Sequence, residues 1–479
     1  MPNISYSTDC EAAPPRVQRL LDPAGAIAAA ALLLLWPAAI NHYPLVFADT
    51  GTYVSQAVER YLGWDRPVFY SFFLLLLHWQ LTLWPAIVVQ ALLAAHTLYL
   101  ALRAFASNRR LWVVPAVAGV LSATTALPWV AAQITPDLAT ALLPLVLALL
   151  VIVPERLGAG ERWWLAAFAT GLIVVHLSNV ILAPLLLVGL LPLRRILGAT
   201  ARLGAAGLLR AGGPWLLALL ALSTVNLIGH GRFVPAPYGN IFYLARSIYD
   251  GPARMVLERD CAAAGWHVCA VLRAPLPANA DDLLWDFDGP LWRDEGTPAA
   301  LSAEAGQIIR RAIAEDPREI VGAALANMVM QLRQFTAGDG LSAWPHTVTP
   351  VIRRDFPPAE AARYEAALQT LDRLHIPRWL EHVHFAVFVA GLAALLITLT
   401  FCLRNRDPLA GLCVAALICL LGNAAITGAL SGPHDRYQAR VVWLAPFAAL
   451  AAVAALGRSR SGISPLPGRA SVSVPAASA

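Results

Sequence analysis

The feature that most constrains this chain is a series of apolar runs, many of them close to 20 residues long. A helix of about 20 apolar residues spans the hydrocarbon core of a bilayer. Ten runs fit this description: 24–40, 85–102, 112–130, 138–153, 163–178, 180–193, 214–229, 383–403, 408–427 and 441–457. Charged residues make up only 14% of the chain, whereas soluble domains carry about 25%. The sequence therefore predicts an all-α polytopic membrane protein with about ten transmembrane helices.

Arginine predicts the orientation of these helices, because short cytoplasmic loops are enriched in basic residues. With both termini in the cytoplasm, most loop arginines fall on the cytoplasmic side. The four exceptions fall in short loops on the outer side: Arg60, Arg66, Arg436 and Arg440. We therefore expect a multi-pass protein of the bacterial inner membrane with both termini cytoplasmic. The apolar segment 67–83 cannot cross in this arrangement and is predicted to be a re-entrant or juxtamembrane helix.

This orientation divides the chain into five parts. They are a cytoplasmic N-terminus at 1–20, an N-terminal transmembrane bundle at 21–229 with its first outer loop at 42–84, a mostly helical periplasmic domain at 230–381, C-terminal transmembrane helices at 382–457 and a disordered cytoplasmic tail at 458–479. Cys261 and Cys269 lie in the predicted periplasmic domain. An oxidising compartment favours a disulfide between them.

Several functional classes have no support in the sequence. There is no Cys/His spacing typical of a metal site, no Walker loop and no dinucleotide-binding fingerprint. The net charge of +5 follows from membrane sidedness, so it does not require a nucleic acid partner. Any phosphate partner would be held by arginine, which offers a planar fork of donors to phosphate oxygens.

The arginines on the outer side need a reason, because short outer loops disfavour basic residues. A lipid phosphate at the membrane rim is one explanation, and it is the one we favour for Arg66, Arg436 and Arg440. The alternative is snorkelling at the interface, or an ion pair with a nearby acid. For Arg60, which has helical spacing and follows Glu59, this simpler alternative is favoured.

Two acidic residues lie on the same predicted side as these arginines. Asp49 follows the first apolar run, and Asp137 occupies a tight loop between the third and fourth. Each has a structural alternative, because an Asp before a helix often caps it. In that case Asp49, Thr50 or Thr52 would begin a helix that Gly63 ends. Charged residues at a membrane edge cost free energy and usually have a functional role. The acids and arginines together therefore predict a functional site.

Four short motifs occur in a characteristic order along the chain. They are FADTGTY with Asp49 and Tyr53, DRPVFYSFF with Arg66, Pro67 and Tyr70, TPD with Asp137, and HDRYQAR with Arg436 and Tyr437. In motif order and topology the chain resembles the GT-C superfamily of membrane glycosyltransferases, which includes protein mannosyltransferases and aminoarabinose transferases. The resemblance covers about residues 20–250 and 380–457. It departs from the mannosyltransferase pattern in having one acid, Asp49, where a pair is common.

The resemblance implies a polyprenyl-phosphate sugar as donor and a periplasmic envelope acceptor, which would be a glycan, a lipid or a protein. Asp49 would act as general base in a direct, inverting displacement. Asp137 would orient the acceptor or, alternatively, share a divalent cation with Asp49. No cofactor and no complete metal site is assigned.

The remaining site residues follow from position near these motifs. Arg66, Arg436 and Arg440 would neutralise the leaving phosphate. The substrate-binding candidates are Tyr53, Tyr70, His176, His434 and Tyr437. For His176 a hydrogen bond between helices is an equally good explanation.

Three other functions remain open from the sequence. An O-antigen polymerase or ligase would rely on arginine and histidine, with little need for carboxylates. A lipid or sugar transporter would place polar groups at the midplane and often has paired repeats. A non-catalytic envelope assembly protein would depend on its periplasmic domain instead of on these residues.

Overall fold

The computed structural model describes residues 22–198, 203–273, 276–292 and 297–459. The predicted N-terminal segment 1–20 and the tail from residue 460 lie outside the described residues. The helices are α1 (Pro23–Leu32), α2 (Trp36–Asn41), α3 (Ala48–Glu59), α4 (Phe69–His78), α5 (Trp84–Phe105), α6 (Val113–Thr124), α7 (Leu127–Ala131), α8 (Asp137–Ile152), α9 (Ala159–Val174), α10 (Leu177–Ile196), α11 (Ala205–His230), α12 (Gly239–Asp250), α13 (Pro252–Ala264), α14 (Ala280–Trp285), α15 (Ser302–Glu315), α16 (Pro317–Arg333), α17 (Thr349–Asp355), α18 (Pro358–Glu365), α19 (Arg378–Arg404), α20 (Leu409–Leu430), α21 (Asp435–Val442) and α22 (Leu444–Ser459).

The predicted all-α class is confirmed for the part of the chain that the structure describes, which contains no strand beyond an isolated bridge between Leu45 and Gln133. Within that part, six helical segments are long and apolar enough to cross a membrane: α5, α10, α11, α19, α20 and the segment Asp435–Leu456 formed by α21 and α22. The chain is thus a multi-pass membrane protein by length and composition. Ten crossings remain a prediction, since the other four predicted spans correspond to shorter helices.

Two of those predicted spans are interrupted. The run 24–40 is divided into α1 and α2, and the run 112–130 into α6 and α7. Proline stands at the start of each second helix, at Pro37 and Pro128. Proline lacks the N–H that would continue the first helix, yet its fixed φ suits the first turn of the next one. The prolines do not interrupt the hydropathy of these runs, so the sequence alone predicts each run to be continuous.

Helix α8 is the centre of the bundle. All of its 16 residues are buried, in keeping with a helix that is apolar on every side. It packs against α5, α9, α10, α20 and α21. Its first residue is Asp137, so the central helix carries a carboxylate at its N-terminal end.

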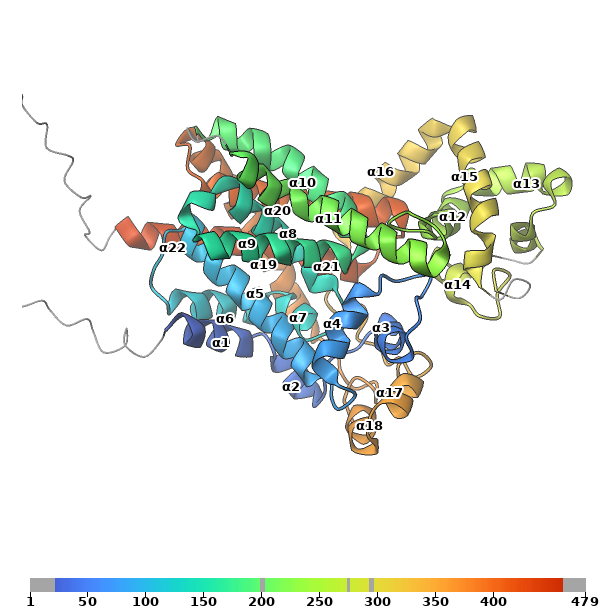
Figure 1. Ribbon diagram of the computed structural model, residues 1–479, viewed down its shortest axis with the longest axis horizontal. Coiled ribbons are helices and arrows are strands. Elements are labelled where there is room, and N and C mark those ends of the chain that lie inside the picture. Colours follow the sequence, from blue (N-terminus) through green and yellow to red (C-terminus); the bar gives the residue numbers. More distant parts are fainter. Residues whose placement is uncertain (1–21, 199–202, 274–275, 293–296, 460–479) are drawn as a thin grey trace, which may run out of the picture.

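The first and last described helices begin and end at one end of the elongated bundle, and α12 to α15 lie at the opposite end (Figure 1). Helix α4, within the segment predicted to be juxtamembrane, has 10 residues. Its length of about 15 Å is too short to span a bilayer. It packs against α3 and α5.

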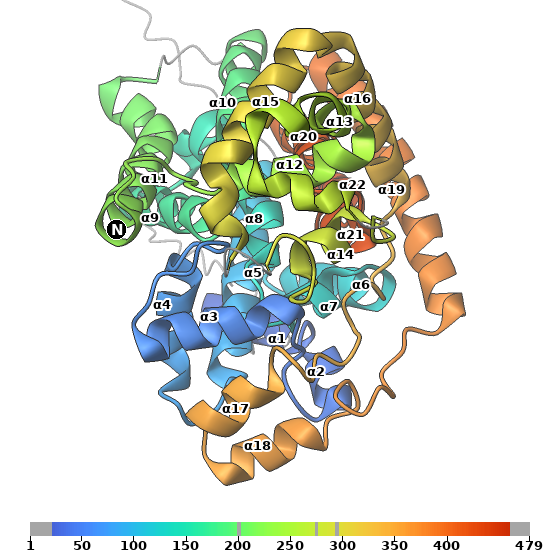
Figure 2. The same cartoon turned by 90° about the vertical axis from the view of Figure 1, so that its right-hand side faces the viewer.

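The predicted periplasmic domain 230–381 contributes to two different cores. Helices α12 to α15 enclose a core of their own, which includes Leu244, Val256 and Ile308. The stretch 337–376 instead joins the main core of the bundle, and α17 packs against α3 (Figure 2). The sequence predicts this insertion to be one unit, because its polar composition does not distinguish the two parts.

The strand-like bridge brings two distant segments together. Leu45 N–H donates to Ala132 O at 3.0 Å, and Ile134 N–H donates to Leu45 O at 2.8 Å. Thr50 Oγ1 donates to Ile134 O at 2.9 Å. These contacts hold the chain that enters α3 beside the chain that enters α8. The helix starts that carry the two acids therefore lie next to each other.

Candidate functional site

A cavity of about 380 Å³ opens where the starts of α3, α8, α10 and α21 converge. The charged and aromatic residues that line it are Asp49, Tyr53, Asp65, Arg66, Asp137, His176, Phe242, Asp281, Trp285, Arg436 and Tyr437. Most of the residues singled out in the sequence thus share one cavity. Arg440, Tyr70 and His434 are placed differently, as described below.

Asp49 does not cap its helix. The N–H of Phe47, which precedes α3, donates to Thr50 Oγ1 at 2.9 Å, so Thr50 makes the capping contact. The carboxylate of Asp49 is left to accept from Arg66 Nη2 at 2.9 Å. Both side chains keep some exposure, 16% for Asp49 and 19% for Arg66. The pair is therefore accessible from the cavity. Helix α3 ends at Glu59, with Arg60 in the left-handed region, and not at Gly63 as expected.

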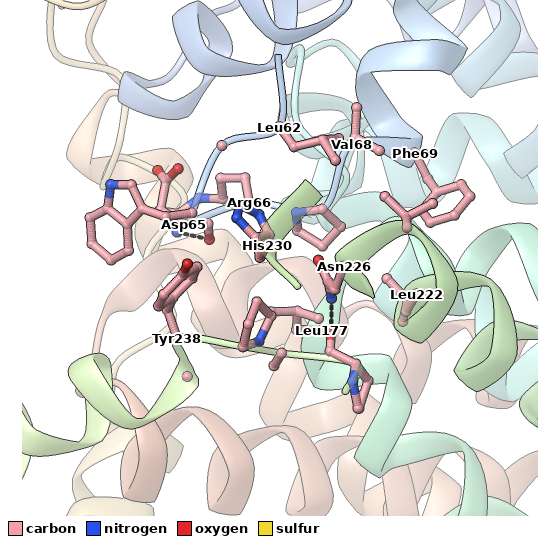
Figure 3. Close-up of a pocket in the computed structure, with 18 of the residues that line it drawn as sticks. Leu62, Asp65, Arg66, Val68, Phe69, Leu177, Leu222, Asn226, His230 and Tyr238 are labelled. Atoms are coloured by element: carbon pink, nitrogen blue, oxygen red, sulfur yellow. Dashed lines mark hydrogen bonds between the residues drawn. The ribbon is translucent and has the colours of Figure 1, made fainter. Parts of the chain in front are cut away.

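Arg66 is held by several groups in addition to Asp49. Its Nη1 donates to the carbonyl of Asp65 at 3.0 Å. Its guanidinium lies over the rings of Trp285 and Phe242, at 5.5 and 5.8 Å from their centroids. Such stacking stabilises a cation by about 0.5–2 kcal/mol. Arg66 also borders a second, smaller cavity of about 40 Å³, shown in Figure 3.

Asp65 lines both cavities and was not singled out from the sequence (Figure 3). Burial raises the pKa of its carboxyl group above the ordinary value of 3.8; the adjacent Arg66 opposes this shift and the charge of Asp49 adds to it. The signal in the sequence is simply an acid next to an arginine, which is too common to identify a site.

Asp137 is held differently from Asp49, because it is fully enclosed. Arg440 Nη1 donates to Asp137 Oδ1 at 2.6 Å, and Arg436 Nη1 lies 3.3 Å from Oδ2. Asp137 also does not cap its helix, whose preceding residue is Pro136. Arg440 has no exposed surface. It therefore lies behind the cavity wall and has no access to a ligand phosphate, in contrast to the role expected for it.

His176 accepts a hydrogen bond in this cluster. Arg440 Nη1 lies 2.8 Å from His176 Nε2. A guanidinium can only donate, so Nε2 must carry no proton. The other ring nitrogen, Nδ1, lies 2.8 Å from Ser178 Oγ and 3.3 Å from the backbone nitrogen of Ser178. The 3.5 Å approach of His176 to Asp137 is therefore not a contact between opposite charges.

Arg436 presents its guanidinium to the cavity. It lies 3.6 Å from the centroid of the Phe47 ring and 5.1 Å from that of Tyr437. Its backbone N–H donates to Asp339 Oδ2 at 3.1 Å. Arg436 and Arg66, more than 300 residues apart in sequence, thus face the same cavity, each over aromatic rings.

The cavity of about 380 Å³ that Asp49 and Arg436 line, the polar cavity, adjoins an apolar cavity. The apolar cavity has a volume of about 360 Å³ and is lined almost entirely by apolar side chains of α4, α8 and α9. Pro136 and Val175 border both cavities. Tyr70 lies in the wall of the apolar cavity, with its ring 4.9 Å from that of Tyr53 and its hydroxyl donating to Gln90 at 2.5 Å.

His434 bonds to an acid that the sequence analysis did not connect with it. Its Nε2 lies 2.5 Å from Asp281 Oδ2 of α14. The hydrogen bond to Asp281 raises the pKa of His434 above its ordinary value of 6.5, although burial opposes the shift. Asp281 lines the cavity, so this pair closes part of its rim. His434 itself lies outside the lining.

Three further expectations concern cysteines, metal ions and Arg60. Cys261 and Cys269 form a disulfide at the end of α13. No cluster of three His, Cys, Asp or Glu side chains suited to a metal ion occurs among the described residues. Arg60 lies outside the lining of the cavity. Glu59, its predicted partner, pairs with Arg354.

Comparison with known protein families, curated proteins and solved structures finds no match to this chain.

Proposed function

We propose that this protein is a membrane glycosyltransferase that moves a sugar from a polyprenyl-phosphate donor to an acceptor of the cell envelope. The observation that carries the proposal is the pairing of two cavities of similar size. One is lined by carboxylates and guanidinium groups, and the other is apolar. An amphiphile with a charged head and a long hydrocarbon tail would fill both.

The donor phosphate would lie between Arg66 and Arg436. A guanidinium has five N–H donors. Among the described residues, the contacts of Arg66 use two of them, to Asp49 and to the carbonyl of Asp65. Three donors of Arg66 therefore remain for phosphate oxygens, and the guanidinium of Arg436 lies near one carboxylate oxygen, Asp137 Oδ2, at 3.3 Å. Charge-assisted bonds of this kind are about twice as strong as neutral ones.

The transfer itself would be a single displacement. The oxygen or nitrogen of the acceptor forms a bond to the anomeric carbon of the sugar, and the bond from that carbon to the phosphate oxygen breaks. The electron pair leaves with polyprenyl phosphate, and the acceptor proton passes to Asp49. One displacement inverts the anomeric centre. Arg66 and Arg436 would stabilise the charge that grows on the phosphate, the kind of contribution that is usually the largest in enzymes.

The same geometry disfavours the alternative functions. A transporter places its ionisable groups near the middle of the membrane, whereas these lie at the helix starts beside α12 to α15. A ligase dependent on arginine and histidine gives no role to Asp49, the carboxylate of the partly exposed ion pair. We place the site on the periplasmic side of the inner membrane, with both termini in the cytoplasm.

The test is the composition of the cell envelope with and without the protein. Mass spectrometry of glycans, lipids and glycoproteins would compare cells that lack the protein with cells that carry it. We expect one glycosylated product to disappear and one polyprenyl-phosphate sugar to accumulate in its absence. Identical envelopes in the two strains would overturn the proposal.

The apolar cavity can be tested separately by filling it. Gly171 lines this cavity on α9, and a Cβ added there would meet no atom within 4 Å. Gly171→Leu should therefore narrow the cavity without disturbing its neighbours, and weaken binding of a long-chain donor by about tenfold. Gly160→Leu, equally open but at the other end of α9, is the matched control. Equal donor affinity in the two variants would show that the hydrocarbon tail of the donor does not bind in this cavity.

A further inference from the structure

Asn423 is a buried amide in a helix that is otherwise suited to a lipid environment. Helix α20 is long and apolar enough to cross a membrane, yet Asn423 lies within it and is 1% exposed. Burying an amide costs free energy unless it is hydrogen-bonded. Polar residues inside membrane helices therefore default to a functional role. Nothing in the proposed transfer accounts for this residue so far.

The contacts of Asn423 fix the direction of its side chain. Its Nδ2 faces two acceptors, Tyr437 O at 2.6 Å and Gln438 Oε1 at 2.9 Å. Its Oδ1 accepts from Arg440 Nη2 at 2.8 Å. The orientation is unambiguous because a guanidinium offers only donors. Gln438 is fixed in turn, since its Nε2 donates to Leu420 O at 3.0 Å.

These contacts continue to the cavity through Arg440 and Asp137. Arg440 bonds to Asn423 on one side and to Asp137 Oδ1 on the other. Asp137 Oδ2 in turn faces Arg436 at 3.3 Å. The order is therefore Asn423, Arg440, Asp137, Arg436, and Arg436 is the cation that lines the cavity.

Both arginines of this series stay charged, so Arg440, Asp137 and Arg436 together carry one net positive charge. Asn423 is neutral, so Arg440 has Asp137 as its one carboxylate partner among the described residues, and the two charges cancel. The net positive charge then remains at Arg436 for a ligand. A second carboxylate at position 423 would take Arg440 for itself and leave Asp137 to neutralise Arg436.

We propose that Asn423 is a positioning residue, whose neutral amide holds Arg440 on Asp137 and so leaves a net positive charge at Arg436 to bind an anionic headgroup. This rests on the proposed function, because it assumes that the headgroup is the donor phosphate. Asn423 does not touch the ligand. It acts through two intervening side chains.

The experiment measures binding of farnesyl phosphate to the purified full-length protein at pH 8, by quenching of tryptophan fluorescence. Asn423→Asp should weaken binding by about ten- to hundredfold, the loss expected for one charge-assisted bond. Asn423→Ser removes the amide but adds no charge, and should weaken binding by less than about fivefold. Thermal unfolding in detergent shows whether each variant is folded.

The outcomes separate this inference from the proposed function. Equal affinities of Asn423→Asp and Asn423→Ser would overturn the positioning role while leaving the proposed function intact. A wild-type protein that does not bind farnesyl phosphate would overturn both. If Asn423→Asp does not fold, Gln438→Glu adds the charge one side chain further from Arg440. It should act in the same direction by a smaller factor, and unchanged binding in that variant would also contradict the role.

Discussion

Asp49 and Asp137, two of the four acids that line the cavity, are held in opposite ways. Asp49 has one guanidinium partner, Arg66, and both side chains are partly exposed. Asp137 is buried against Arg440 and Arg436, with His176 also beside it. A carboxylate held by buried cations cannot readily take a proton, whereas one in a single accessible pair can exchange its partner for a substrate. Under the proposed function, we therefore expect proton transfer at Asp49 and charge placement at Asp137.

The largest expected effect is on the rate when Asp49 is changed. Asp49→Asn removes the proton acceptor and should reduce transfer by about 10²- to 10⁴-fold. The Asp49→Asn variant should lose less stability than Asp137→Asn, because the Asp49–Arg66 pair keeps some solvent exposure and the Asp137–Arg440 pair keeps almost none. Transfer rate and thermal unfolding in detergent measure the two effects. Asp288→Asn, an exposed acid outside the cavity, is the control. A rate equal to that of the control would exclude Asp49 as base.

Asp137 should show the reverse pattern, a large loss of stability. Asp137→Asn leaves Arg440 buried without a carboxylate partner. Breaking a buried pair in this way costs about 3–5 kcal/mol. Chemical unfolding in detergent would measure the loss against Asp49→Asn. Equal stability of the two variants would show that the contrast between the two acids is wrong.

The smallest expected effect concerns the rim, where His434 and Asp281 form a third, more exposed pair. The groups that act on His434 are Asp281 and Asp339, which favour its charged form, and Arg436, which opposes it. Because the pKa of His434 is raised in the folded protein, the pair contributes its full stability below pH 6.5, the ordinary pKa. This contribution to stability is lost as the pH rises through the raised pKa of His434.

Limited proteolysis of α12 to α15 as a function of pH would measure this effect. We expect cleavage to increase above neutral pH in the wild type and to depend less on pH in His434→Asn. The same pH dependence in both proteins would show that another group is responsible.

Much of the fold follows from the sequence, because apolar runs and arginine positions depend only on local composition. The long helices α5, α10, α11, α19 and α20 lie close to the predicted runs. The packing of 337–376 against the main core could not be anticipated. It depends on contacts such as those of Gln369 with Asn41 and Val46, which lie more than 300 residues away in the chain.

The site shows the same division between local and long-range information. Asp49, Arg66, Asp137 and Arg436 stood out as charges beside apolar runs, and the structure places them around one cavity. Arg440 carried the same signal but is buried, since only its contacts reveal which side of the helix it occupies. Asn423 and Asp281 were missed. The available signal for Asn423 was a single amide in an apolar run. No signal in the sequence distinguished Asp281 from other exposed acids.

The central claim is that one amphiphile occupies both cavities, with its phosphate between Arg66 and Arg436. A structure of the protein in lipid nanodiscs with farnesyl phosphate tests it most directly. We expect the phosphate to contact both guanidinium groups and the prenyl chain to pass between Pro136 and Val175 into the apolar cavity. A phosphate bound elsewhere, or a chain lying outside the apolar cavity, would contradict it.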